Sequence, residues 1–519
     1  MTKLNKLEKF FRFLIYILPG ALFFSYYPLF HFGSDESMNF EISLPMIWLI
    51  LFDFLVVFLL IKRKLLKKIV DYWAWLILPG FLTISVFWSL NPVRGLLTVG
   101  ILWLIYFAVF SFWQLKDLFS EDSFREKFWK VFFGSTLVIC VWCLVQCILD
   151  IAGVSRDYSL MCAGCTYQMF GFPHPNGFAI EPQFMGNLLL APAIMSGWLI
   201  LRSRPRPAGP SARAAGANSR AAALRNAVSL KHYNILFLAL ATTLFLTFSR
   251  GAIYAFVIAM IILTIIYQSS KMFGLGHTQG RSTLRVVRVP RGGLAKLTVP
   301  NQTLKTLTKM WLVIIFAFAI AINVQGVMAE VGPTNDTYKS GVAKVLNHLS
   351  LGVIDIREQK DEINNDIDDK NGAIEEALVD EENQEAVFDG YVAESTDTRM
   401  RLTNAAITVW SKDIRTILFG VGLGGAGKAL YNNGLSPAPK EIIQNEYASL
   451  LLETGLIGIA LLAITIVLII RVTLKSKIAL PLLVIMVAYG ISLCFFSGLQ
   501  NALQIYLLPA VILSLYGKN

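Results

Sequence analysis

The chain has 519 residues, of which 55% are hydrophobic and only 16% are charged, and its mean hydropathy is +0.58. A soluble domain carries roughly a quarter charged residues, so this composition excludes an ordinary water-soluble protein. The net charge of +11 comes from basic residues in short segments beside long apolar blocks. That arrangement is typical of membrane topology signals and not of a nucleic-acid-binding surface.

Twelve apolar runs, flanked by Lys or Arg, predict an all-α fold: a polytopic membrane bundle of about twelve transmembrane helices. An even number of spans places both termini on the cytoplasmic side. The run from Phe10 to Phe30 is too long for a cleaved signal peptide and ends without a small-residue cleavage site. The predicted spans cover residues 10–31, 44–61, 69–90, 95–115, 131–153, 183–201, 233–249, 252–268, 310–328, 456–472, 478–497 and 500–516.

The distribution of charge supports this topology. No acidic residue occurs between Glu181 and Glu330, whereas the loops 202–232 and 269–309 are strongly basic, as expected for cytoplasmic loops. The Pro/Ala/Gly/Arg-rich part of the first loop predicts a disordered basic tether near anionic headgroups. The chain therefore divides into nine spans over 1–328, a large extracytoplasmic loop over 329–455, and three spans over 456–519.

The large loop has two parts. Residues 335–397 are rich in Asp, Glu and Asn, which predicts solvated, partly disordered sequence, whereas 398–455 is expected to be helical. Apolar residues recur at helical spacing from Thr398, with Thr398 or Asp397 as the N-cap, and again over 441–455, where Gly455 should end an interfacial helix.

A glycine-rich stretch, GVGLGGAGK, lies between these two helices. Its residues 422–429 nearly match the phosphate-binding GxxxxGK[ST] loop, but Ala429 replaces the Ser or Thr that would bind magnesium. The stretch also follows a predicted helix and not a strand, and it lies on the side away from ATP. A hinge or close backbone packing explains these glycines better than a nucleotide site.

Four arginines are candidates for binding an anion. Arg250 lies in the hairpin TFSRGA at the outer end of the seventh and eighth spans, where an ionisable residue suggests function. The alternative is an arginine that snorkels to headgroups. Arg399 and Arg401 open the loop helix and suit phosphate, although a solvated basic face explains them equally well. Arg94, in the turn NPVRG, either joins them or is a surface residue.

Two further candidates, His174 and Glu181, lie among prolines in GFPHPNGFAIEPQFMG at the mouth of the sixth span. Either could act as a general base if it is buried near substrate. The alternative is a rigid proline-rich loop in which Glu181 caps the span. The cysteines indicate packing inside the fifth span and a lone CxxC at Cys162 and Cys165, so no metal site is expected.

Four motifs, in this order and spacing, resemble the O-antigen ligase/O-antigen polymerase family of bacterial envelope polysaccharide glycosyltransferases. They are the WSLNP turn (88–92), the SRGA hairpin (249–252), the unit from Arg399 to Gly425, and QNEYASLLLETGLIGIALL (444–462). The resemblance implies a GT-C-like bundle that takes a glycan from polyprenyl (undecaprenyl) diphosphate. The glycan would be transferred at the outer face of the inner membrane to a glycan or glycolipid acceptor, without cofactor, nucleotide or nucleic acid.

The resemblance also implies roles for individual residues. The family's diphosphate-binding arginines map to Arg250 and to Arg399, with Arg401 as an alternative register. Further substrate contacts are expected from residues in or near these motifs and at the mouth of the sixth span. These residues are Arg94, Glu181, Ser249, Gln444, Asn445 and Tyr447.

One departure from the family matters for mechanism, because family ligases carry His-Asn where this chain has Gln444 and Asn445. Gln444 cannot act as a base. Glu446, Glu441 or His174 would have to replace the histidine, or leaving-group stabilisation would have to carry the reaction. The departure favours a polymerase or a divergent transferase over a ligase.

The main alternative from another class is a flippase of lipid-linked glycans. A flippase should present charged residues along several spans that line a cavity, whereas these spans are nearly free of charge except for Asp53. The pattern therefore favours a transferase.

Overall fold

The computed structural model describes residues 6–32, 40–65, 73–152, 175–179, 181–202, 232–272, 301–331, 337–350, 398–439, 441–495 and 502–516. His174, Asp397 and the CxxC cysteines lie outside these residues. So do the basic insert over 203–231 and the acidic sequence over 351–397.

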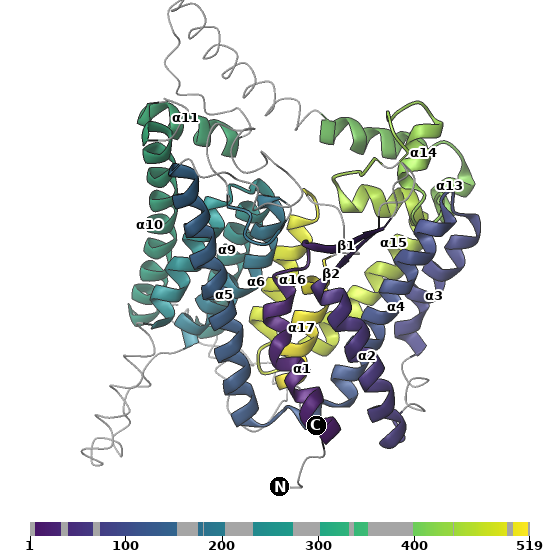
Figure 1. The fold of residues 1–519 in the computed structure, drawn as a ribbon, viewed down its shortest axis with the longest axis horizontal. Helices are drawn as coiled ribbons and strands as arrows, with labels where there is room; N and C mark the ends of the chain where they lie inside the picture. The colour runs from purple at the N-terminus through teal and green to yellow at the C-terminus, as the bar shows by residue number, and fades with distance from the viewer. Residues whose placement is uncertain are drawn as a thin grey trace, which may run out of the picture.

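The described chain is a bundle of apolar helices (Figure 1). Seven of its helices are long and apolar enough to cross a membrane, which makes the protein an integral membrane protein. They are α2 (Leu44–Lys62), α4 (Pro92–Gln114), α5 (Asp122–Ile151), α6 (Pro182–Arg202), α9 (Arg250–Met272), α10 (Asn301–Val331) and α15 (Glu446–Thr473). Shorter helices are α1 (Lys6–Leu22), α3 (Trp73–Ser85), His232–Leu246, α16 (Ala479–Ser492) and α17 (Leu503–Tyr516).

Each of the twelve predicted spans overlaps one of these helices, although the number that crosses the membrane stays a prediction. The first span is corrected in extent. Helix α1 ends at Leu22, and β1 (Pro28–Phe32) then pairs antiparallel with β2 (Phe40–Ser43). The expectation of an all-α fold is therefore wrong at this ribbon. An apolar run does not by itself distinguish the end of a helix from a short strand.

A second correction concerns the acidic part of the large loop. Helix α11 (Tyr338–Leu349) begins at an N-cap, Thr337, whose side chain accepts the backbone N–H of Ser340. It packs against α10 where two glycines, Gly326 and Gly341, allow close approach. Within the segment 335–397, for which partly disordered sequence is expected, residues 338–349 are therefore ordered. The helix contains no acidic residue, and averaging its composition with 350–397 concealed it.

The described ends of the chain lie on one face of the bundle, which we call the terminal face (Figure 1). Helices α11, α13 (Ile414–Phe419) and α14 (Ala426–Asn432) lie on the opposite face, the loop face. An even number of spans requires both ends on one side, so this agrees with the predicted topology. Which face is cytoplasmic stays a prediction.

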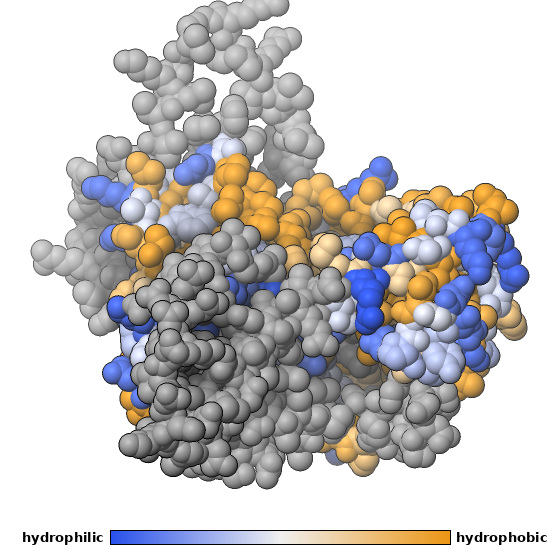
Figure 2. Space-filling view, turned by 90° about the horizontal axis from the view of Figure 1, so that it is seen from above, coloured by the Kyte–Doolittle hydropathy of each residue, from blue (hydrophilic) through white to orange (hydrophobic). Residues whose placement is uncertain are grey.

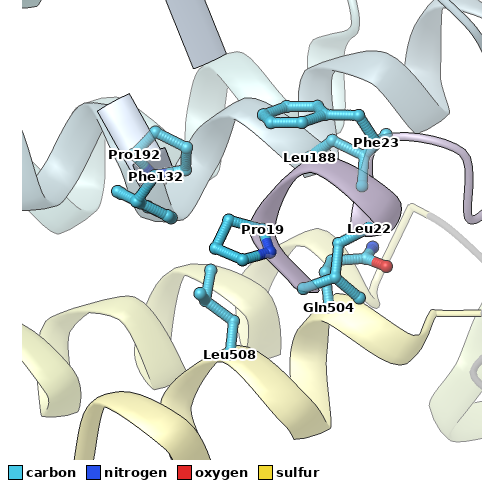
Figure 3. Close-up of a pocket in the computed structure, with 8 residues that line it drawn as sticks. All are labelled: Pro19, Leu22, Phe23, Phe132, Leu188, Pro192, Gln504 and Leu508. Carbon is cyan, nitrogen blue, oxygen red and sulfur yellow. The ribbon is translucent and has the colours of Figure 1, made fainter. Parts of the chain in front are cut away.

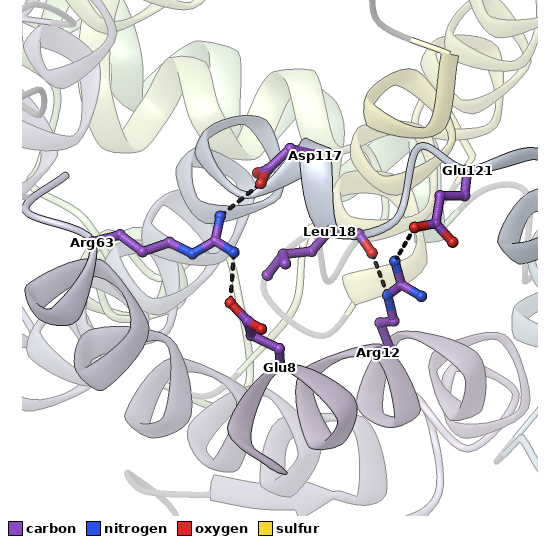
Figure 4. Close-up of polar contacts among 6 residues, drawn as sticks. All are labelled: Glu8, Arg12, Arg63, Asp117, Leu118 and Glu121. Carbon is purple, nitrogen blue, oxygen red and sulfur yellow. Dashed lines mark hydrogen bonds and ion pairs between the residues drawn. The ribbon is translucent and has the colours of Figure 1, made fainter. Parts of the chain in front are cut away.

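Charge pairs hold the terminal face together (Figure 4). Arg63, after α2, contacts Glu8 of α1 at 2.6 Å and Asp117 at 2.7 Å. Arg12 of α1 pairs with Glu121 at 3.0 Å and donates to the carbonyl of Leu118. These bonds tie the starts of α1 and α5 to the end of α2. Arg12 and Arg63 therefore stabilise the packing of these helices.

Arg63→Ala should destabilise the protein more than Lys130→Ala. Arg63 makes two charge-assisted bonds and is only 27% exposed, whereas Lys130 forms one pair with Glu126 and is 72% exposed. We expect the free energy of unfolding to fall by about 2 kcal/mol for Arg63→Ala and by less than about 0.5 kcal/mol for Lys130→Ala. Denaturant unfolding in detergent micelles measures both. Equal losses of unfolding free energy in the two variants would contradict a stabilising role for the Arg63 charge pairs.

Candidate functional site

The WSLNP turn and the glycine-rich loop form one packed unit on the loop face. The hydroxyl of Ser89 donates to the carbonyl of Leu423 at 2.7 Å, and the backbone N–H of Leu90 donates to the carbonyl of Val421 at 3.3 Å. The first motif therefore lies against the third, more than 300 residues later in the chain.

Close backbone packing explains the glycines of this loop. Gly420, Gly422 and Gly424 have φ angles of +71°, +88° and +78°, which L side chains rarely adopt. A Cβ atom on Gly422 would lie 2.4 Å from the Cα atom of Ser89. The interpretation of close packing is confirmed, and helix α13 precedes the loop, as the argument against a nucleotide site required.

The fourth motif opens α15. Asn445 is its N-cap, and its side-chain oxygen accepts the backbone N–H groups of Tyr447 at 3.1 Å and Ala448 at 3.2 Å. The helix therefore begins at Glu446, and the predicted start at residue 441 is wrong, because the asparagine cap sets the boundary. The predicted break at Gly455 is confirmed by its φ angle of +62°, but α15 continues beyond it.

Glu453, which the sequence analysis did not select, ties α15 to the glycine-rich loop. Its side-chain oxygen accepts the backbone N–H of Ala426 at 3.3 Å, and its carbonyl accepts that of Gly422 at 3.0 Å. Arg94 lies near enough to interact with its charge. The available signal was an acidic residue inside an otherwise apolar helix, just before a glycine.

The predicted loop helix is present over 398–410 and packs on α14 and α15. Arg399 is half-buried at its start, whereas Arg401 is exposed. Figure 2 shows the loop face, where polar side chains gather over the lobe at the right that contains α13 and α14. The buried cluster under this lobe consists of Leu402, Ala405, Ala406, Val409, Ala426, Ala429, Leu430, Ile443, Ala448 and Leu452.

The SRGA hairpin is the turn between the helix His232–Leu246 and α9. Ser249 caps α9, because its hydroxyl accepts the backbone N–H of Ala252 at 3.4 Å. Arg250 is the first residue of α9, and only 8% of it is exposed. A snorkelling arginine would be exposed at the lipid boundary, so its burial favours the functional reading. Gly186 of α6 packs directly against Ser249 and Ala252.

The end of α16 joins this hairpin to the start of α15. On one side, the carbonyl of Leu493 accepts the backbone N–H of Glu446 at 3.0 Å, and that of Gly490 accepts the hydroxyl of Tyr447 at 2.7 Å. On the other side, Phe495 packs against Gly251, where a Cβ atom would approach within 2.7 Å. The second and fourth motifs thus flank one short segment, 490–495.

Glu181 provides a second connection between the two halves. It directly precedes α6, accepts a hydrogen bond from Gln183, and lies near enough to Arg399 to interact with its charge. Burial raises the pKa of the Glu181 carboxyl, while the Gln183 bond and the Arg399 charge act in the opposite direction. Five residues further on, Gly186 contacts the SRGA hairpin, so this one segment spans from Arg399 to the neighbours of Arg250.

Gln444 is the residue at which the sequence resemblance predicts the family histidine. It is half-buried, and its side-chain oxygen is buried with no hydrogen-bond partner among the described residues. Glu446, two residues later, is 7% exposed. A buried hydrogen-bond acceptor and a buried carboxylate therefore lie two residues apart at the start of α15.

A separate pocket lies inside the bundle, away from these motifs (Figure 3). Its walls come from α1, α5, α6 and α17, and Gln504 is its one polar lining residue. It suits apolar packing and not diphosphate binding. Among the described residues, no group of three His, Cys, Asp or Glu side chains could hold a metal ion.

Taken together, the bundle and its motifs define a polytopic membrane protein with arginines and carboxylates gathered on one face. Residues 235–463 match the model of a protein family described as O-antigen ligase. The match covers three of the four motifs and confirms the resemblance to the O-antigen ligase/polymerase family. No curated protein and no solved structure matches the chain.

This family consists of glycosyl-transferring enzymes. The match supports an O-antigen ligase-type function in polysaccharide synthesis, with a lipid-linked glycan as substrate in a membrane setting.

Gly422→Ala should impair stability and transfer far more than Gly434→Ala. Both positions have positive φ angles, so both substitutions carry about 1 kcal/mol of backbone strain. Only at Gly422 would the new Cβ atom meet backbone, which adds about 1–3 kcal/mol. Thermal unfolding and glycan-transfer rate measure the difference. Equal effects would mean that contact with Ser89 is unimportant.

The raised pKa of Glu181 makes a prediction about pH. The folded protein holds this proton more tightly than the unfolded chain, so the free energy of unfolding should fall as pH rises from about 4. Glu181→Gln should remove that part of the decline. Thermal unfolding across a pH series measures it.

Asp413 is a control for which the pH dependence of stability should have the opposite sign, because the backbone N–H of Thr416 lowers the pKa of its carboxyl. Asp413→Asn should remove stability that is gained as pH rises. An unchanged pH profile in Glu181→Gln would contradict the burial of the carboxyl at residue 181.

Proposed function

We propose that the protein transfers or polymerises an oligosaccharide carried on polyprenyl diphosphate, at the outer face of the cytoplasmic membrane. The observation that carries this proposal is that one short segment connects the surroundings of Arg250 with Arg399. Arg250 is buried at the start of α9, and the segment 181–186 extends from the charge of Arg399 to the packing neighbours of Arg250. Two guanidinium groups suit the two phosphates of a lipid diphosphate.

In the proposed reaction an acceptor hydroxyl oxygen attacks the anomeric carbon of the donor sugar. The bond from that carbon to the diphosphate oxygen breaks, and the electron pair leaves with the polyprenyl diphosphate. Arg250 and Arg399 stabilise the negative charge that develops on the departing diphosphate. Arg401, which is exposed, is the less suitable of the two alternatives on the loop helix.

The proton of the acceptor hydroxyl must go to a base. We assign this role to Glu446, which is buried at the start of α15. The buried side-chain oxygen of Gln444 would accept a hydrogen bond from a neighbouring hydroxyl of the acceptor sugar. Glu441 is half-buried nearby in the chain and is the alternative. Because the family histidine is replaced by Gln444, polymerase activity or a divergent transfer is favoured over ligation.

A lipid-linked-glycan flippase is the alternative of another class, and the distribution of buried charge argues against it. Asp53 of α2 is 4% exposed and lies in the middle of a span, whereas Arg250 and Glu446 lie at helix starts on the loop face. One carboxyl does not line a path across a membrane.

Reconstituted protein supplied with a polyprenyl-diphosphate oligosaccharide should release polyprenyl diphosphate and form longer or transferred glycan. Arg250→Ala and Arg399→Ala should each lower the rate by about 100-fold, since each removes a donor to the leaving group. Glu446→Gln should lower it by at least about 100-fold. Arg415→Ala, at an exposed arginine of α13, is the matched control and should transfer like the parent.

The assay also separates the competing functions. Movement of labelled glycan across the bilayer without a new glycosidic bond would establish a flippase. Full activity in both Arg250→Ala and Arg399→Ala would refute the site. Product length distinguishes the subclasses, because a polymerase makes a ladder of repeats and a ligase makes a single transfer.

A further inference from the structure

Helix α11 contacts the SRGA hairpin from the loop face through two hydrogen bonds. Nε2 of His348 lies 3.2 Å from the carbonyl oxygen of Phe248, and the hydroxyl of Tyr254 donates to the carbonyl of Leu349. Phe248 lies two residues before Arg250, and Tyr254 lies four residues after it. The two bonds therefore bracket Arg250 along the chain.

The backbone at Phe248 explains why the first bond matters. Phe248 has a φ angle of +44° and is 1% exposed. A bulky residue in this left-handed region is strained and persists only where its surroundings hold it. If α9 extended one turn backwards, the carbonyl of Phe248 would accept the backbone N–H of Ala252. That N–H is instead taken by the hydroxyl of Ser249.

The carbonyl of Phe248 thus finds its partner in His348. A carbonyl oxygen only accepts hydrogen bonds, so the hydrogen of this bond is carried by Nε2. His348 is 6% exposed, so this hydrogen bond lies away from water, where losing it is costly. The bond therefore favours the turn that places Arg250 at the first position of α9.

Helix α11 is itself anchored by its packing against α10. Its Gly341 packs on Ala329 of α10, where a Cβ atom would approach within 2.5 Å. The hydroxyl of Tyr338 donates to the side-chain oxygen of Asn323 at 2.6 Å. These contacts with α10, a long helix of the bundle, thus fix the position of His348.

We propose that His348 is a positioning residue for glycan transfer, acting through the carbonyl of Phe248 to hold the hairpin that presents Arg250 to the diphosphate. This inference rests on the proposed function of Arg250. It assigns a specific role to a part of the large loop whose composition predicts solvated, partly disordered sequence. His348 does not act on the substrate itself.

The test compares His348→Ala with His348→Gln in the full-length reconstituted protein. Alanine removes the donor to Phe248, whereas glutamine supplies a side-chain N–H of similar reach. Because a misplacement of about 1 Å can reduce a rate about 100-fold, His348→Ala should lower kcat by about 10- to 100-fold. KM for the acceptor should be little changed, and His348→Gln should recover most of the rate.

His232→Ala is the matched control. It removes the same kind of side chain from an exposed position at the start of the helix His232–Leu246, at the other end from the hairpin. It should transfer like the parent. Tyr254→Phe removes the second bond and should produce a smaller loss of the same kind.

A double-variant cycle distinguishes positioning from general destabilisation. If His348 acts through Arg250, then His348→Ala should cost little further rate in an Arg250→Ala background. Independent losses in the two variants would overturn the proposal. So would a fully active His348→Ala, or a His348→Gln variant that is as slow as His348→Ala.

Hydrogen exchange of the amides over 248–253 supplies a readout that does not need activity. Exchange should quicken in His348→Ala and return toward the parent rate in His348→Gln. If the parent transfers no glycan, the proposed function fails, and exchange alone decides whether His348 holds the hairpin. Unchanged exchange in His348→Ala overturns the proposal whatever the activity.

Discussion

The contact of backbone with backbone between Gly422 and Ser89 is the constraint on which the candidate site depends. It requires a residue without a Cβ atom, because any side chain at 422 would collide with the turn after α3. The carbonyl of Glu453 takes the N–H of Gly422 and so adds α15 to the same unit. Three segments far apart in the chain are thereby fixed together, and the helix that carries Arg399 packs on top of them.

The other half of the site is built on a strained turn. The left-handed backbone at Phe248 ends one helix and allows Ser249 to cap the next, which places Arg250 in the first turn of α9. Close packing of Gly186 and Gly251 against neighbouring helices leaves the turn little room to move. Strain of this kind is often found at functional positions, where the surroundings hold it.

The two faces of the bundle use arginine differently. On the terminal face, Arg12 and Arg63 are paired with carboxylates of neighbouring helices and serve the fold. On the loop face, Arg250 and Arg399 lie at the starts of two helices. In the proposed reaction their guanidinium groups would stabilise the negative charge of the departing diphosphate.

The sequence by itself determined the membrane class, the positions of the helices and the four motifs, and it selected Arg250 as a candidate, because apolar length and misplaced charge are local properties of the chain. It also predicted the family, and a match over 235–463 confirms it. The local sequence pattern did not predict the ribbon β1–β2. It also missed α11, because the composition was averaged over too long a segment. It also placed the start of α15 five residues too early, since the cap at Asn445 sets that boundary.

Only the tertiary structure decided which motifs meet. The carboxylate of Glu453 on the glycine-rich loop, the segment 490–495 between two motifs, and His348 against the carbonyl of Phe248 all join residues that are distant in sequence. No periodicity in the chain encodes such contacts. They arise because buried backbone groups must find partners, and in a packed bundle those partners come from whichever helix lies alongside.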